Sequence, residues 1–195
     1  MGVLGSTRGS SLVPILSAIA GGDLGGVSVV TVISNVANAG ILEKAAAAGI
    51  PHHTVLCAGR PKSAHEDEIS SLLHSAGVDI VLCCGWMRIL SPTFVARWRH
   101  RIINVHPSLL PAHAGGMDLE VHAAVLKAKE TVSGCTVSSF VGGGAINSFY
   151  HPTALCPTYS PPPSHPFHLL CYYARFMLLL RRLMLASPLY SEPAL

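Results

Sequence analysis

Charged residues are scarce in this chain of 195 residues: Asp, Glu, Lys and Arg make up 12% of it, against about 25% in a typical soluble domain. Hydrophobic residues make up 50%, which excludes an intrinsically disordered polyelectrolyte. The formal net charge is only +3. Because nucleic-acid binding normally needs a strongly basic surface, we expect no nucleic-acid partner.

Three further absences limit the class of protein. None of the six cysteines forms a Cys-x-x-Cys pair, so a zinc ribbon is disfavoured and we expect no metal. No uncharged apolar run reaches 18 residues, since the nearest one, 167–186, contains three Arg, and we expect no membrane partner. Residues 1–30 lack the basic start and apolar run of a secretory signal, which favours reduced thiols and a cytoplasmic location.

Acidic and aromatic residues are distributed unevenly along the chain. All five Tyr and four of the five Phe follow Val137, whereas nine of the ten acidic residues precede it. Beyond this point come three consecutive Gly and a segment with six Pro, which neither a helix nor a central strand accepts. The sequence therefore predicts a domain over residues 1–137, a disordered Gly/Pro-rich linker over 138–166, and a tail over 167–195 that could form a short helix.

Residues 1–137 alternate strand and helix signals. Short apolar, β-branched runs predict strands at residues 3–4, 27–33, 53–57, 79–84 and 102–105. Between them, Ser63 and Glu66 form a capping-box pattern, and Ser91 precedes Pro92 as a helix cap would. Asp118 can cap a later helix with an apolar stripe. This alternation predicts an α/β fold with a doubly wound, mostly parallel, Rossmann-like sheet.

Ligands bind open parallel sheets beyond the carboxyl ends of the strands. After the first strand, residues 5–11 form a Gly/Ser loop that opens a helix. Its free backbone N–H groups and the hydroxyls of Ser10 and Ser11 suit a phosphate. An ordinary strand–helix turn with a serine cap would have the same pattern. The loop matches neither the Walker motif nor a complete Gly-x-Gly-x-x-Gly fingerprint.

Two later strand ends also carry candidate residues. Residues 85–92 form an apolar loop with a single Arg, which suits a flat heteroaromatic ligand or, equally, supplies core residues for the next helix. Asn104 and His106 stand two residues apart and so share one face of a strand. An amide donor beside an imidazole is suited to holding an oxyanion and moving a proton.

These residues carry a family resemblance. Residues 1–137 resemble the phosphoribosylglycinamide formyltransferases through Gly-Ser-Ser at 9–11, Gly-Trp-Met-Arg-Ile-Leu at 85–90 and Asn-Val-His-Pro-Ser-Leu-Leu-Pro at 104–111. The segments 121–125 and 134–137 resemble the family as well. The resemblance implies the formyltransferase type of Rossmann-like sheet, which we expect to be incomplete at its C-terminal end because the similarity stops at Val137.

The resemblance also implies an activity, namely formyl transfer from the co-substrate 10-formyltetrahydrofolate to the amine of glycinamide ribonucleotide in de novo purine biosynthesis. Asn104 and His106 would then be catalytic. The substrate phosphate would be bound by Gly9, Ser10 and Ser11. The folate would be bound by Lys62, Met87, Arg88, Ile89, Leu90 and Asn104. No metal takes part. Lys62 stands where the family usually has an Arg, so the charge is kept and the planar fork is lost.

One departure from the family pattern bears on activity. The family pairs its catalytic His with an Asp that follows the similar region, and this sequence has no Asp after Asp118. Two alternatives therefore stand beside the enzyme: a non-catalytic truncated remnant, which either binds ligands or binds nothing, and another folate-dependent formyltransferase or deformylase. Relatives of plant type often carry a plastid transit segment, so a plastid is the alternative to the cytoplasm.

Overall fold

The computed structural model describes residues 1–154 except 107, 116–118, 131 and 142–143. The chain divides into two compact units, which are described separately below. The first unit contains Met1–Asn104 and Ser138–Asn147, and the second contains Val105–Val137 and Ser148–Leu195. In the described part of the chain, no helix has both the length and the apolar character needed to cross a bilayer.

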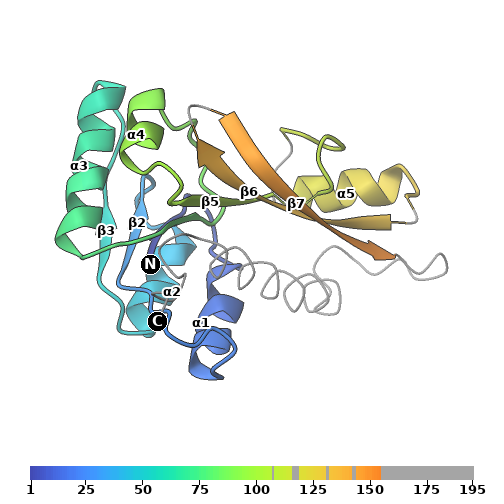
Figure 1. Ribbon diagram of the computed structural model, residues 1–195, viewed down its shortest axis with the longest axis horizontal. Coiled ribbons are helices and arrows are strands. Elements are labelled where there is room, and N and C mark those ends of the chain that lie inside the picture. Colours follow the sequence, from blue (N-terminus) through green and yellow to red (C-terminus); the bar gives the residue numbers. More distant parts are fainter. Residues whose placement is uncertain (107, 116–118, 131, 142–143, 155–195) are drawn as a thin grey trace, which may run out of the picture. The chain divides into compact units, whose positions relative to one another are not determined.

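The first unit is organised around parallel strands in the order β3-β2-β1-β4-β5. Figure 1 shows β3 and β2, which form one end of this order, side by side. At its centre, Leu4 of β1 stands opposite Ile33 of β2 and Cys83 of β4, and Cys83 stands opposite Asn104 of β5. The strand order reverses between β1 and β4, and such a switch point is where doubly wound sheets bind their ligands. The strands are β1 (Gly2–Leu4), β2 (Thr31–Ser34), β3 (His52–Thr54), β4 (Val81–Cys83) and β5 (Ile102–His106).

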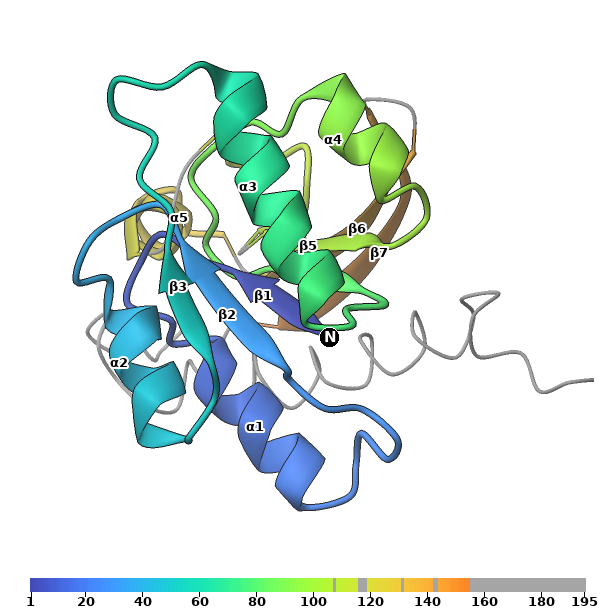
Figure 2. The ribbon, with the colours of Figure 1, turned by 90° about the vertical axis from the view of Figure 1, so that its left-hand side faces the viewer.

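Four helices cover the two faces of this sheet. Helices α1 and α2 lie against one face and α3 and α4 against the other (Figure 2). Each of them connects two parallel strands, as the alternating pattern of the sequence predicted, so the doubly wound α/β class is confirmed. The helices are α1 (Leu12–Ala20), α2 (Gly40–Ala47), α3 (Lys62–Ser75) and α4 (Pro92–Arg97).

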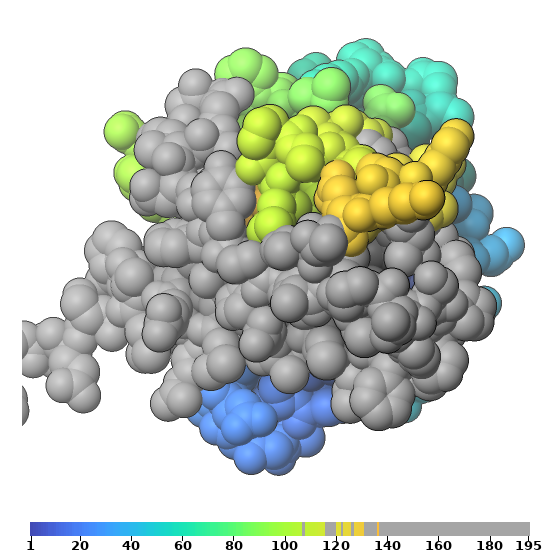
Figure 3. Space-filling view, turned by 90° about the vertical axis from the view of Figure 1, so that its right-hand side faces the viewer, coloured from blue at the N-terminus to red at the C-terminus, as the bar shows by residue number. Residues whose placement is uncertain are grey.

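The second unit contains the end of β5, helix α5 (Leu119–Lys127) and much of the strands β6 (Val132–Val141) and β7 (Gly144–Ala154). Val121 and Val125 of α5 are buried, as the predicted apolar stripe requires. The opposite side of α5 lies on the surface (gold in Figure 3). Asp118, the predicted cap of this helix, lies outside the described residues.

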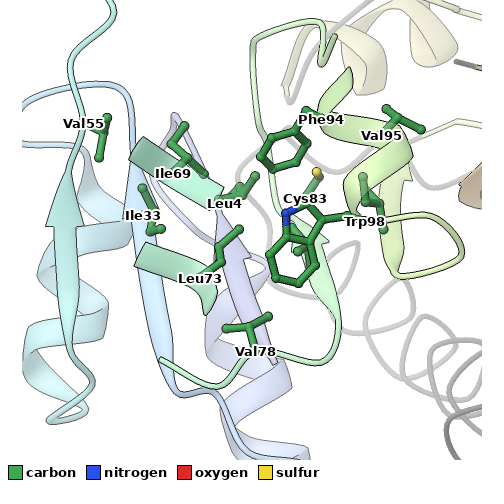
Figure 4. Packing of buried hydrophobic residues seen from close by; sticks show 12 residues of the cluster. Leu4, Ile33, Val55, Ile69, Leu73, Val78, Cys83, Phe94, Val95 and Trp98 are labelled. Carbon is green, nitrogen blue, oxygen red and sulfur yellow. The ribbon is translucent and has the colours of Figure 1, made fainter. Parts of the chain in front are cut away.

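The core of the first unit lies between the sheet and the pair α3 and α4 (Figure 4). Trp98, just after α4, is fully buried there, and its indole N–H donates a hydrogen bond of 3.0 Å to Ser70 Oγ. Cys83 belongs to this cluster, whereas the neighbouring Cys84 is buried outside it. Burial raises the pKa of the Cys83 thiol to about 12 and raises that of Cys84 as well. Around these residues pack Leu4, Ile33, Val55, Ile69, Leu73, Val78, Phe94 and Val95.

The structure differs from the sequence-based expectation beyond Val137. Strand β6 runs through this position to Val141, and β7 covers Gly144–Ala154, where a disordered linker was expected and the sheet was expected to end. Val141, Ile146 and Phe149 are β-branched or aromatic residues, which favour strands. The rest of the predicted linker and the whole predicted tail lie outside the described residues.

The predicted capping box of α3 is also wrong. The helix begins at Lys62, Pro61 takes the cap position, and no side chain caps the first turn. Ser63 therefore lies within the first turn, and the Glu66 carboxylate binds Ser91 instead. The predicted cap at Ser91 is confirmed, because its Oγ accepts a hydrogen bond from the Phe94 N–H.

Candidate active site

The loop after β1 makes a close approach to α2 that only glycine permits. Gly9 has a φ of +68°, and a Cβ at this position would lie 2.6 Å from the Cβ of Ile41 and 2.7 Å from its Cα. The carbonyl of Thr7 accepts a hydrogen bond of 3.1 Å from the Ile41 N–H, and the carbonyl of Gly9 accepts one of 3.1 Å from the Leu12 N–H. These contacts fix the backbone that leads into α1.

Ser10 and Ser11 lie at the N-terminal end of α1 with free hydroxyls. Both residues are partly exposed, Ser11 occupies the cap position, and neither side chain has a hydrogen-bond partner among the described residues. Pro14 in the first turn of α1 has no N–H, so the donors left at this helix end include the two hydroxyls. Together with the positive end of the helix dipole, they suit an anion. The structure thus brings the predicted phosphate residues into one turn.

Ser6 connects three loops that follow three different strands. Its hydroxyl donates to Asn35 Oδ1 at 2.6 Å and accepts from the Met87 N–H at 2.9 Å. Its own N–H donates to the carbonyl of Gly85 at 3.0 Å. Ser6 is nearly buried, so both side-chain hydrogen bonds are shielded from water. The loop that opens α1 is therefore held against the loop after β4, on the two sides of the switch point.

The loop after β4 combines buried and exposed apolar residues. Gly85 has a φ of +65°, and a Cβ there would lie 2.5 Å from Thr7 Oγ1. Trp86 and Leu90 pack against the core, whereas Ile89 is 86% exposed and Arg88 is exposed. The structure therefore supports both interpretations of this loop, since some residues anchor it and others are available to a ligand. The indole N–H of Trp86 is buried without a hydrogen-bond partner among the described residues.

Glu66 anchors the far end of this loop. Its carboxylate is buried on α3, and it accepts hydrogen bonds from the Ser91 N–H at 2.8 Å and from the Ser91 hydroxyl. Ser91 in turn caps α4 through the Phe94 N–H at 3.1 Å. One carboxylate thus fixes both the end of the loop and the start of the next helix.

Lys62 and Asn104 are the remaining candidates of the first unit. Lys62 is exposed at the first position of α3. Asn104 is partly buried on β5, and its side-chain amide has no hydrogen-bond partner among the described residues. An amide held on a rigid strand with free donors is suited to a ligand oxygen.

His106, the last residue of β5, lies in the second unit. Its Nε2 lies 3.3 Å from the backbone carbonyl oxygen of His113. A carbonyl only accepts hydrogen bonds, so Nε2 carries a proton and the lone pair of the neutral ring is on Nδ1. Burial lowers the pKa of His106, and the hydrogen bond to the His113 carbonyl acts in the opposite direction. Burial thus favours the neutral form of the ring.

A buried threonine shapes the loop that follows β5. Thr136 Oγ1 accepts from the Leu110 N–H at 2.9 Å and donates to the Ser108 carbonyl at 2.7 Å. Ser108 Oγ donates to the Ala112 carbonyl at 2.6 Å.

In the part of the chain that the structure describes, no group of three or more His, Cys, Asp or Glu side chains could hold a metal ion.

Sequence reasoning missed the residues that hold these loops together. Ser6 belongs to the Gly/Ser loop, but its partners lie 29 and 81 residues away. Glu66 had been interpreted through a local capping pattern, although its partner lies 25 residues away. Thr136 lies in the last segment that resembles the family, and that resemblance is the only signal that pointed to it.

The parallel, doubly wound sheet defines a Rossmann-like α/β protein. At its switch point, the glycine-dependent loop that opens α1 lies beside the apolar loop after β4, and this edge is the candidate ligand site. The comparisons with known proteins then identify the family. The chain matches the formyl transferase family over residues 1–143 and belongs to it. Within this family of transferases its relatives are phosphoribosylglycinamide formyltransferases, so the resemblance inferred from the motifs is confirmed.

Three relatives illustrate the extent of the similarity. The phosphoribosylglycinamide formyltransferase of Haemophilus influenzae is 36% identical over 148 residues, which cover 74% of this chain and 68% of the relative. The trifunctional purine biosynthetic protein adenosine-3 of Drosophila pseudoobscura pseudoobscura is 43% identical over 137 residues, 69% of this chain, and the chain spans only 10% of that protein. The structure of phosphoribosylglycinamide formyltransferase from Coxiella burnetii in complex with CHES is similar with a TM-score of 0.79 at 28% identity, covering 95% of this chain and 85% of that one.

Proposed function

We propose that the chain transfers the formyl group of 10-formyltetrahydrofolate to the amine of glycinamide ribonucleotide, a step of de novo purine biosynthesis. The observation that carries this proposal is the link through Ser6 between the loop that opens α1 and the apolar loop after β4. A phosphate-bearing substrate and a flat, aromatic co-substrate need two such loops side by side. Family membership supports the same activity.

Each loop offers the groups that its ligand needs. Gly9, Ser10 and Ser11 would bind the substrate phosphate through backbone N–H groups, hydroxyls and the helix dipole. Met87 and Leu90 would contact the pterin, together with the exposed side chains of Arg88 and Ile89. Lys62 is free to pair with a carboxylate of the folate.

Asn104 and His106 would carry out the chemistry. When the substrate amine attacks the formyl carbon, a C–N bond forms and the formyl oxygen gains negative charge, to which the Asn104 amide donates a hydrogen bond. The neutral His106 ring accepts the proton that the amine loses, through the lone pair on Nδ1. The resulting imidazolium returns a proton to the folate nitrogen as the carbon–nitrogen bond to the folate breaks.

The absence of any Asp after Asp118 favours a second candidate function, ligand binding with very little turnover. In serine proteases, removing the carboxylate that orients the catalytic His lowers the rate by about 10⁴-fold. By analogy we expect turnover about 10³-fold or more below that of a complete enzyme of this family, with both ligands still bound.

One set of measurements tests both functions. Formyl transfer is followed with purified protein, 10-formyltetrahydrofolate and glycinamide ribonucleotide, and the binding of each ligand is measured by calorimetry. His106→Ala should abolish turnover and leave binding nearly unchanged, whereas His53→Ala, at an exposed position of β3, should change neither. Formate release that does not need glycinamide ribonucleotide would instead indicate a deformylase. Failure to bind either ligand would refute both proposed functions.

A further inference from the structure

A short chain of contacts connects α5 to the candidate catalytic histidine within the second unit. His106 Nε2 donates to the backbone carbonyl of His113 at 3.3 Å. The side chain of His113 donates through its own Nε2 to Glu130 Oε1 at 2.7 Å. Glu130 lies three residues after the end of α5, and its N–H donates to the carbonyl of Val125 in that helix at 3.3 Å. The carboxylate is thus attached to a regular element.

The backbone of His113 needs this support. Its φ is +55°, in the left-handed region that residues with a side chain rarely adopt. This conformation carries an energetic cost for a residue with a side chain. The hydrogen bond from the His113 ring to Glu130 offsets that cost, because it fixes the side chain in the position that requires the left-handed backbone. The two side chains are only 19% and 35% exposed, so water competes weakly for this hydrogen bond.

The left-handed turn decides where the carbonyl of His113 lies. If His113 relaxed to an ordinary negative φ, its peptide would rotate and the acceptor for His106 would move away. Among the described residues this carbonyl is the one hydrogen-bond partner of the His106 ring. The orientation of the His106 ring and the position of its proton therefore depend on the side-chain contact between His113 and Glu130, although neither of these side chains touches the ring.

We infer that Glu130 and His113 are positioning residues for His106, which fix its ring with the proton on Nε2 and the lone pair on Nδ1. This inference rests on the proposed function, in which His106 moves a proton. It assigns to this pair the orienting role for which the family uses an Asp that this sequence lacks. The acceptor is a neutral carbonyl rather than a carboxylate, so the pair orients the ring without adding a negative charge beside it.

The test uses the whole chain with ¹⁵N-labelled histidine and follows the ring nitrogens of His106 by NMR through a pH titration. In Glu130→Ala we expect the Nε2 proton to exchange with solvent about tenfold faster, and the pKa of His106 to fall because the carbonyl no longer supports the charged ring. Glu130→Gln retains an oxygen that can accept from His113 and should restore most of the wild-type signals. Glu120→Ala, at an exposed position of α5, is the matched control.

Two outcomes would overturn the inference: wild-type ring signals and pKa of His106 in Glu130→Ala, or the same changes in the control variant. A kinetic measurement completes the test. In Glu130→Ala, kcat for formyl transfer should fall about tenfold while KM for 10-formyltetrahydrofolate stays within about twofold. If the wild-type chain transfers no formyl group and the NMR signals still respond as expected, the proposed function fails and the positioning of His106 stands.

Discussion

Replacing Ser6 by Ala is the sharpest test of how the candidate site is held together. The substitution removes one oxygen atom that makes two hydrogen bonds, to Asn35 Oδ1 and from the Met87 N–H. A typical intramolecular hydrogen bond contributes about 1 kcal/mol net, and a buried donor left without a partner costs about 1–3 kcal/mol. Since Ser6 is nearly buried, we expect Ser6→Ala to lower the free energy of unfolding by about 2 kcal/mol.

The same substitution should weaken the binding of both ligands. Without the hydroxyl, the loop that opens α1 and the loop after β4 lose this side-chain link and keep the backbone hydrogen bond from Ser6 to Gly85. Part of the binding free energy of each ligand must then go into ordering a loop that Ser6 no longer holds. Every 1.4 kcal/mol spent in this way weakens binding about tenfold. We expect Kd for glycinamide ribonucleotide and Kd for 10-formyltetrahydrofolate each to rise about tenfold.

Urea unfolding and calorimetry measure the two effects. Ser71→Ala is the matched control, because its hydroxyl donates to the Asp67 carbonyl at 2.9 Å on the exposed side of α3. Loss of that bond should change the free energy of unfolding by no more than about 0.5 kcal/mol. An unfolding free energy of Ser6→Ala equal to that of the control, with both Kd values unchanged, would refute the role assigned to Ser6.

Three further predictions concern other parts of the molecule. In Glu66→Gln an NH₂ group replaces one of the two carboxylate oxygens that accept from the N–H and the hydroxyl of Ser91, so the free energy of unfolding in urea should fall by about 2–3 kcal/mol. In Glu68→Gln, which breaks an exposed ion pair, it should fall by about 0.5 kcal/mol. In Gly9→Ala the new Cβ would lie within 2.7 Å of the backbone and side chain of Ile41, whereas in Gly26→Ala only the left-handed φ is strained, at about 1–2 kcal/mol. Gly9→Ala should therefore lower the free energy of unfolding more than Gly26→Ala. Equal melting temperatures of the two variants would contradict this. The pKa of His106 is depressed on folding, so its contribution to stability is complete above about pH 6.5 and is lost as the pH falls towards the lower folded value. Urea titrations should therefore show a smaller acid-side loss of stability in His106→Gln than in the wild type.

Local patterns predicted the elements of the first unit because each depends on neighbours in sequence. The cap at Ser91 followed by Pro92 specifies the start of α4 without any tertiary contact. The length of strands does not follow from such patterns. The run at 27–33 predicted one strand, yet β2 comprises Thr31–Ser34 because its ladder partner β1 begins at Gly2, which stands opposite Thr31. Strand ends are thus determined by the neighbouring strand.

The candidate site was predictable as a set of loops but not as a connected structure. The position of Asn104 and His106 on one strand followed from their spacing and from the proline after His106. The contacts that support them did not, because Glu130 and His113 are 17 residues apart and meet only through a left-handed turn. Nothing in the pattern of either residue indicates that turn, since it is stabilised by the contact itself.

Two adjacent free thiols, Cys83 at the end of β4 and Cys84 just after it, allow unfolding to be followed by alkylation. Cys83 is in the cluster beneath α3 and α4, and Cys84 is buried outside that cluster. A thiol reacts with an alkylating agent as the thiolate, and the raised pKa values of these two keep that form rare until water reaches them. Peptide mass spectrometry can measure the alkylation rates of Cys83 and Cys84 separately. Comparing the two rates would show whether the layer of α3 and α4 detaches before the centre of the sheet opens or together with it. The partly exposed Cys57 provides the internal reference for the reactivity of an accessible thiol.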